Sequence, residues 1–159
     1  MPSAGWVTVI TTKQIARNLR DAVNEATLWL NSISDEESGR PLAEGKWSRK
    51  EIIGHLIDSA SNNHQRFVRA QLAEHYESAR YTQNEWVSLQ HYRDAEWRSL
   101  ITLWREFNLH LARVIESTPD DVAARHRIQL VNSDEAQSLG WWMNDYVGHL
   151  RHHLGQIVS

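Results

Sequence analysis

The segment "DYVGHLRHHLGQI" near the end of the chain holds three histidines, His149, His152 and His153. Neutral imidazole is the commonest protein ligand for transition metals. A helix turns by about 100° per residue, so His149 and His153 lie one turn apart at the border of an apolar stripe, while His152 points further outward. The spacing predicts a ligand pair of His149 and His153. The same pair is also typical of a solvated histidine-rich helix face.

A third ligand is available in "WSRKEIIGHLIDSASNNHQRF". On a helix, His55, Ser59, Asn62 and Arg66 form one polar line beside an apolar side. Such a line is typical of a pocket wall, and equally of a solvated face. His64 falls among apolar neighbours, which indicates a packed core histidine rather than a ligand.

Four segments position these residues. In each, apolar residues recur every three or four positions, which predicts an amphipathic helix. Ser48 and Glu51 form a capping box at the start of the second segment. The four predicted helices cover residues 12–34, 48–75, 92–117 and 138–158.

The connections between these segments are long and polar. "YESARYTQNEWVSLQH" reads as a crossover with one short helical turn at most, and no segment shows the alternation of a strand. The sequence therefore predicts an all-α protein: a four-helix bundle with long crossover connections, forming one domain over residues 1–159.

Composition narrows the function. The 159 residues include no cysteine, which excludes disulfides, thiolate ligands and cysteine nucleophiles, and the net charge of −3 is spread over both signs. A nucleic-acid-binding surface would show a basic excess. No apolar run approaches the length of a membrane span, and the N-terminus has no signal-peptide pattern. We expect a cytoplasmic protein with no nucleic-acid or membrane partner.

The segments "KWSRKEIIGHLIDSASNNHQRFVRAQL" and "LGWWMNDYVGHLRHHLGQI" resemble the DinB/YfiT-like superfamily of metalloenzymes. The first is similar to the family pattern W-S-x-x-E-[IV]-x-x-H-[LI]-x-[DE], and the second to D/E-x-x-x-H-x-x-x-H-x-x-Q-[IL]. The resemblance covers essentially the whole chain. It implies a four-helix bundle, commonly paired as a homodimer. It also implies one divalent metal ion, nickel or zinc, held by His55, His149 and His153.

Some members of that superfamily are similar to thiol S-transferases that use bacillithiol, mycothiol or glutathione, and others to maleylpyruvate isomerase. Three neutral histidines leave a divalent ion with its full charge and open positions, as in catalytic sites. We therefore expect a metal-dependent thiol S-transferase acting on a small electrophile, or a related hydrolase. Without cysteine in the chain, a low-molecular-weight thiol must come as cosubstrate. The side chains expected to orient substrate or ligands are Asn62, Arg66, Trp142, Tyr146 and Gln156, with Asp145 as an alternative.

Two other functions stay open from the sequence. A non-catalytic metal-binding or small-molecule-binding stress-response protein would need a fourth ligand, and no such ligand is found at helical spacing. A helical dimerisation module is the other alternative, because Trp-rich helix faces often pair.

Overall fold

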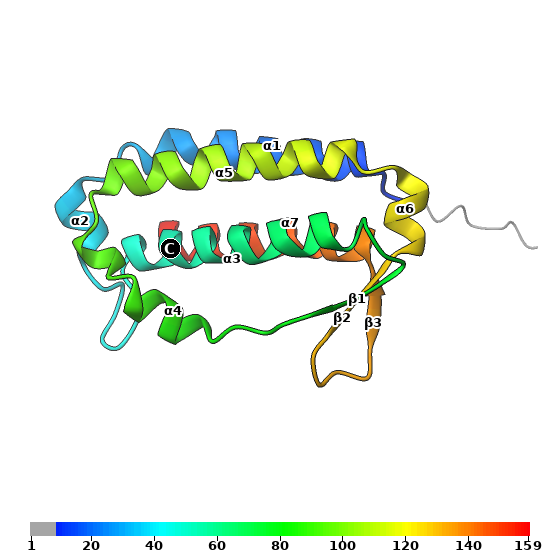
Figure 1. The fold of residues 1–159 in the computed structure, drawn as a ribbon. Helices are drawn as coiled ribbons and strands as arrows, with labels where there is room; N and C mark the ends of the chain where they lie inside the picture. Colours follow the sequence, from blue (N-terminus) through cyan, green and yellow to red (C-terminus); the bar gives the residue numbers. More distant parts are fainter. Residues whose placement is uncertain (1–8) are drawn as a thin grey trace, which may run out of the picture.

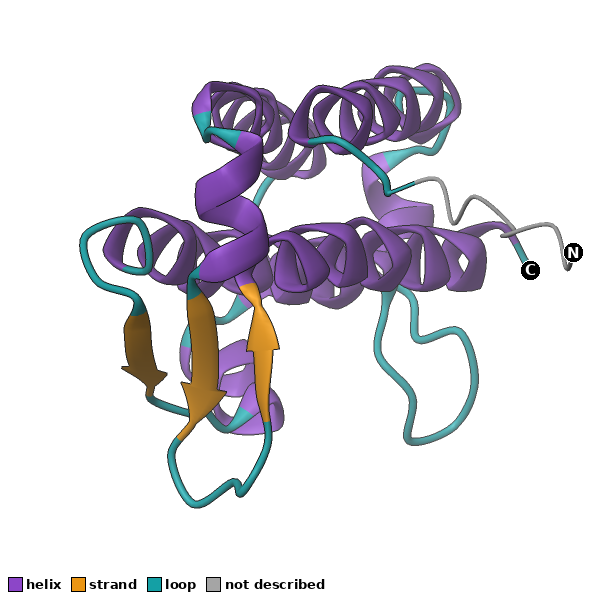
Figure 2. Ribbon diagram, turned by 90° about the vertical axis from the view of Figure 1, so that its right-hand side faces the viewer, coloured by secondary structure: helices purple, strands orange, loops and turns teal. Residues whose placement is uncertain are grey.

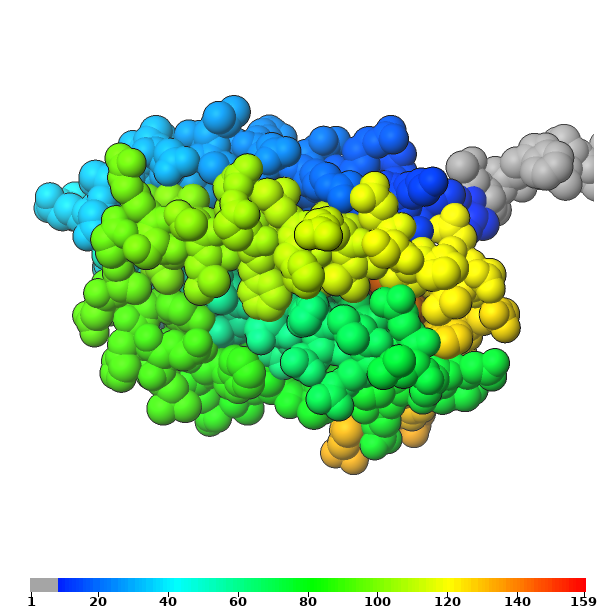
Figure 3. All heavy atoms as spheres, turned by 45° about the horizontal axis from the view of Figure 1, so that its top comes forward, coloured from blue at the N-terminus to red at the C-terminus, as the bar shows by residue number. Residues whose placement is uncertain are grey.

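Four long helices build the protein in the computed structural model, which describes residues 9–159. They confirm the predicted four-helix bundle. The helices α1 and α5 form one layer, and α3 and α7 form the other (Figure 1). In Figure 3, side chains of α1 and α5 lie against each other along the length of this face. The four helices are α1 (Thr12–Leu30), α3 (Arg49–Arg69), α5 (Trp97–Ser117) and α7 (Leu139–Val158).

The direction of the helices explains the long crossover. Both α3 and α5 run in one direction, and α1 and α7 run in the other (Figure 1). Because α3 and α5 are parallel neighbours, the chain must return along the whole bundle between them. Residues 70–96 make this return, and they carry β1 (His75–Ser78), α4 (Gln83–Leu89) and a 3-10 turn, η1 (Tyr92–Asp94).

A small sheet at one end of the bundle was not predicted. Strand β1 pairs in parallel with β2 (Arg127–Leu130), and β2 pairs antiparallel with β3 (Ala136–Ser138). Figure 2 shows the three strands side by side beneath the helix layers. Strands of three or four residues are too short to show an alternating pattern in the sequence.

Several predicted boundaries were wrong. The second helix ends at Arg69 rather than at residue 75, where the sheet begins, and the third begins at Trp97 rather than at residue 92. Two further short helices were missed, α2 (Asp35–Gly39) and α6 (Asp120–Arg125). Helices of five or six residues contain too few turns to establish a periodic stripe.

The start of α3 is fixed as predicted. The Ser48 hydroxyl accepts a hydrogen bond from the Glu51 amide, and the Glu51 carboxylate accepts one from the Ser48 amide at 2.7 Å. This capping box satisfies two of the free amide groups at the helix end. It thereby determines where α3 begins, two turns before His55.

One buried apolar core joins all four long helices. Trp97 and Trp104 of α5 are among its largest side chains, and the Trp97 indole also donates to the Leu30 carbonyl at 3.1 Å. Burial of aromatic side chains of this size contributes strongly to bundle stability. None of the helices in residues 9–159 is both long and apolar enough to cross a bilayer.

The crossover is anchored to α3 through Tyr92 and Gly54. The Tyr92 hydroxyl donates to Asp58 Oδ1 at 2.6 Å, and its ring lies directly over Gly54. A Cβ on Gly54 would overlap the ring carbons of Tyr92, so only glycine allows this approach.

Substituting Gly54→Ala should therefore lower the free energy of unfolding by about 1–3 kcal/mol, the usual cost of overpacking a core. Gly148→Ala is the matched control, because a Cβ there meets nothing within 4 Å. It should raise stability by about 0.5–1 kcal/mol through helix propensity alone. Urea denaturation measures both changes, and equal effects would contradict the packing argument.

Candidate functional site

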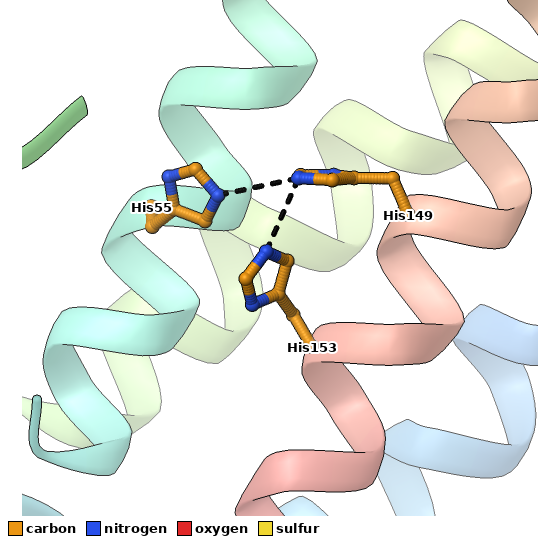
Figure 4. Close-up of side chains that lie close together, drawn as sticks. All are labelled: His55, His149 and His153. Carbon is orange, nitrogen blue, oxygen red and sulfur yellow. Dashed lines mark hydrogen bonds between the residues drawn. The ribbon is translucent and has the colours of Figure 1, made fainter. Parts of the chain in front are cut away.

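Three histidines converge between α3 and α7. His55 comes from α3, and His149 and His153 come from successive turns of α7 (Figure 4). The Nε2 atom of His149 lies 3.4 Å from that of His55 and 3.1 Å from that of His153. One nitrogen from each ring falls within 4.8 Å of the other two. The structure thus brings together the three residues that the sequence singled out.

His152 stays outside this cluster. Its side chain is exposed on α7, and its ring centroid lies 5.2 Å from that of His153. The reason is the helix repeat: residues four apart share a face, and the residue just before the second one points away.

The spacing of the nitrogens fits a divalent metal ion. Zinc binds imidazole nitrogen at about 2.0–2.1 Å, so two such ligands in a tetrahedral site lie about 3.3 Å apart. The two separations from His149, of 3.1 and 3.4 Å, match this value, and the third pair lies within 4.8 Å. Three neutral ligands would leave such an ion with its +2 charge and an open coordination position.

Burial keeps the three rings neutral. It lowers the pKa of His55 to about 3 and that of His149 to about 4, with the charges of the neighbouring histidines adding to the effect. Burial also lowers the pKa of His153. A metal ligand must offer a lone pair, so depressed pKa values favour the form of imidazole that binds a cation.

Gln156 and Trp47 support the rings. The Gln156 side-chain oxygen lies 2.9 Å from Nδ1 of His153, which assigns the ring proton to Nδ1 and leaves the Nε2 lone pair facing the cluster. The Trp47 ring, whose centroid lies 5.2 Å from that of His55, was not singled out as a site residue. The one feature of the sequence that points to Trp47 is its position directly before Ser48, the N-cap of the helix that carries His55. The Nδ1 atom of His55 is buried and has no hydrogen-bond partner in the part of the chain that the structure describes.

Cavities lie on both sides of the cluster. One of about 230 Å³ has His149 in its wall, together with Arg66, Trp142 and Tyr146. The other, of about 540 Å³, is lined by His153, Gln156 and Trp47. His149 and His153 are therefore each reachable from a different cavity, whereas His55 is fully buried, an arrangement that suits a site that admits small molecules.

The other predicted site residues differ in their placement. Asn62 is not among the residues that line the smaller cavity, and its amide donates back to the Asp58 carbonyl at 2.9 Å. Its neighbour Asn63 lines this cavity, and the Asn63 amide bonds in the same way to the Ser59 carbonyl at 2.9 Å. The Tyr146 hydroxyl donates to Asn108 Oδ1 at 2.5 Å, so it is already held in place. Asp145 also faces the cavity, and burial raises its pKa.

The position of His64 differs from the prediction that it packs in the core. It is half-buried rather than in the core, and its ring lies near those of His110 and Phe107 on α5, with centroids 5.3 and 5.7 Å away. Helical spacing predicts apolar neighbours for His64 on its own helix. The neighbouring helix α5 covers the His64 side chain only partly.

The relationship to known proteins follows from the whole sequence. Residues 18–157 match the model of the DinB superfamily. The chain belongs to the DinB superfamily. It is similar to a protein of Bacillus subtilis (strain 168) named "Putative metal-dependent hydrolase YfiT", with 24% identity over 155 residues that cover 97% of this chain and 81% of that protein. These findings confirm the family resemblance seen in the two histidine-bearing segments.

The fold agrees with this membership. The solved structure of YfiT from Bacillus subtilis, described as having an unusual four-helix bundle topology, superposes with a TM-score of 0.83 at 20% identity. The match covers 92% of this chain and 83% of the YfiT chain. The parallel pair α3 and α5, with its long return, is the unconventional feature of the present bundle.

The depressed pKa values predict an acid-sensitive metal-free protein. Below the ordinary histidine pKa of 6.5, these histidines are protonated in the unfolded chain but stay neutral in the folded protein, because burial lowers their pKa. The free energy of unfolding should therefore fall as the pH decreases from about 6.5 towards 4. Chelator-treated protein, unfolded with urea at a series of pH values, would show this slope.

The His55→Gln variant should show a smaller slope, because it removes one of the three buried imidazoles. His152→Gln, on the exposed side of α7, is the matched control and should behave as the parent protein. Equal slopes for the parent and His55→Gln proteins would contradict the argument.

Proposed function

We propose that this protein is a divalent-metal-dependent enzyme that acts on a small molecule, with His55, His149 and His153 as the metal ligands. The observation that carries the proposal is the convergence of three neutral Nε2 atoms at the spacing of metal ligands. Among the described residues, no further histidine, aspartate or glutamate joins this cluster. Three protein ligands with an open position are typical of catalytic rather than structural sites. The name of the relative YfiT, which refers to metal-dependent hydrolysis, supports the same proposal.

Nickel and zinc are the ions we propose, since imidazole suits both. When bound, such an ion supplies a Lewis acid that activates a water or a thiol. The protein contributes position and environment. Gln156 holds the His153 ring in the required tautomer, and the His55 side chain is completely buried. The cavity beside His149 gives a substrate room to approach.

The finer proposal concerns the nucleophile, which we expect to come from outside the chain. None of the 159 residues is cysteine, so a thiol nucleophile would be a low-molecular-weight cosubstrate. Thiolate is intrinsically the better nucleophile near neutral pH, which favours S-transfer to a small electrophile. Hydrolysis is the variant in which water takes the place of the thiol.

The ligand assignment predicts the metal content. Purified protein should carry about one divalent ion per chain. His55→Ala and His149→Ala should each lose it, because two remaining imidazoles bind far more weakly. Elemental analysis by mass spectrometry after dialysis measures this.

His152→Ala is the control for the loss of any histidine from α7, and it should retain the ion. Retention of one ion by the His55→Ala,His149→Ala double variant would disprove the ligand assignment.

The activity prediction uses two reactions. Protein loaded with zinc, nickel or manganese should transfer a thiol to a chlorinated aromatic, and should hydrolyse an activated ester more slowly. His153→Ala should reduce both rates to background, since the variant keeps the cavity but loses a ligand. Bacillithiol, mycothiol, glutathione and coenzyme A form the thiol panel.

His152→Ala should keep both rates within about twofold of the parent, as expected for an exposed surface change. Ester hydrolysis faster than thiol transfer would reassign the enzyme as a hydrolase. No metal-dependent rate with any pair, despite a bound ion, would favour the non-catalytic metal-binding alternative.

A further inference from the structure

Arg66 is a buried cation without a buried anion. Its side chain on α3 is only 8% exposed, yet no carboxylate of the described residues forms a salt bridge with it. Arginine is rarely buried unless it is paired, because removing its charge from water is costly. Packing alone therefore does not explain why the charged guanidinium of Arg66 is buried at this place.

The hydrogen bonds of Arg66 hold the guanidinium in position without using all of its donors. It donates to Ser78 Oγ at 2.8 Å, to Asn63 Oδ1 at 3.4 Å and to the Ala79 carbonyl at 3.3 Å. The Trp142 ring covers the group, with its centroid 5.3 Å from Cζ. A guanidinium has five N–H donors, so two remain for a ligand. These contacts are all to neutral groups, and none neutralises the charge.

The cavity beside His149 collects more positive than negative charge. Arg66 and Arg80 both line it, and Asp145 is the one carboxylate in its wall among residues 9–159. Arg80 comes from the crossover and is fixed by a bond from its Nε to the Val131 carbonyl at 3.1 Å. Burial raises the pKa of Asp145, which disfavours its charged form in this environment. A cavity of about 230 Å³ holds an oxyanion and a few neighbouring atoms rather than a large ligand.

We propose that this cavity is an oxyanion subsite, in which Arg66 and Arg80 bind a carboxylate or phosphate group of a small ligand. Arginine suits this role because its planar donors match both oxyanions in a bidentate manner. His149 lies in the same wall, so a ligand anchored here extends towards the histidine cluster. That this ligand is the substrate rests on the proposed function, whereas the subsite itself does not.

Titrations with three probes of similar shape test the subsite. Phenyl phosphate, benzoate and the neutral benzamide are added to the full-length protein, both zinc-loaded and metal-free. The indole N–H signal of Trp142, which lies over the guanidinium, reports binding by NMR. The two anions should bind and benzamide should not. The tighter anion identifies whether phosphate or carboxylate is the preferred group.

Arg66→Gln should weaken anion binding by about ten- to hundredfold, the effect of losing charged hydrogen bonds. Arg69→Gln is the matched control, because Arg69 lies on the same helix, is exposed and bonds to Gln65. It should leave binding unchanged. If Arg66→Gln fails to fold, Arg80→Gln provides the test, since its exposed side chain should be removable with a several-fold loss of affinity.

Equal binding of benzamide and benzoate, or unchanged affinity in the folded arginine variants, would overturn the subsite. Loss of anion binding on metal removal would also overturn it, because the anion would then sit on the metal. Arg66-dependent binding without any metal-dependent turnover would sustain the subsite and contradict the proposed function. Metal-dependent turnover without any preference for anionic ligands would sustain the proposed function and contradict the subsite.

Discussion

Three imidazoles that face one another within 4.8 Å can coexist only if they are neutral or share a cation, since two protonated rings at this distance repel strongly. This constraint governs the middle of the bundle. Burial against α3 and α7 holds the rings neutral, and the positions of both helices must be fixed for the nitrogens to meet. The capping box at Ser48 fixes where α3 begins, and the buried core of large side chains fixes how α7 lies beside it.

Because α3 and α5 are parallel, the crossover between them not only connects the two helices but also lines the cavity beside His149. The crossover runs along the whole bundle (Figure 1), and part of it lines the cavity that has His149 in its wall. Ser78 and Ala79 bond to Arg66 there, and Arg80 and Tyr81 complete the cavity wall. Pairing of β1 with β2 holds the segment in place. The topology thus adds Arg80, Tyr81 and Gln83 of the crossover to a cavity that is otherwise lined mainly by α3 and α7.

The polar environment of the site is divided between its two sides. Near His149, the cavity presents two arginines and one carboxylate. The second cavity, near His153, is lined by Gln156, Trp47 and Lys46. The two sides of the histidine cluster therefore offer chemically different surroundings to small molecules.

The sequence by itself determined the four long helices and the family, and it predicted the histidine trio that the structure brings together. Helical periodicity and the i, i+4 histidine pair are local properties, and His55 stood out because it lies on a polar line of its own helix. The role of Gln156 beside His153 was also visible from spacing, because residues three apart on a helix are neighbours.

Only the tertiary structure decided what faces the site from other elements. Trp47, Arg80 and the three short strands lie in or beside connections without periodic pattern, so their positions depend on the course of the crossover and on strand pairing between residues about fifty positions apart. Local sequence carries no signal for such pairings, because their energy arises from contacts between distant segments rather than from neighbours in the chain.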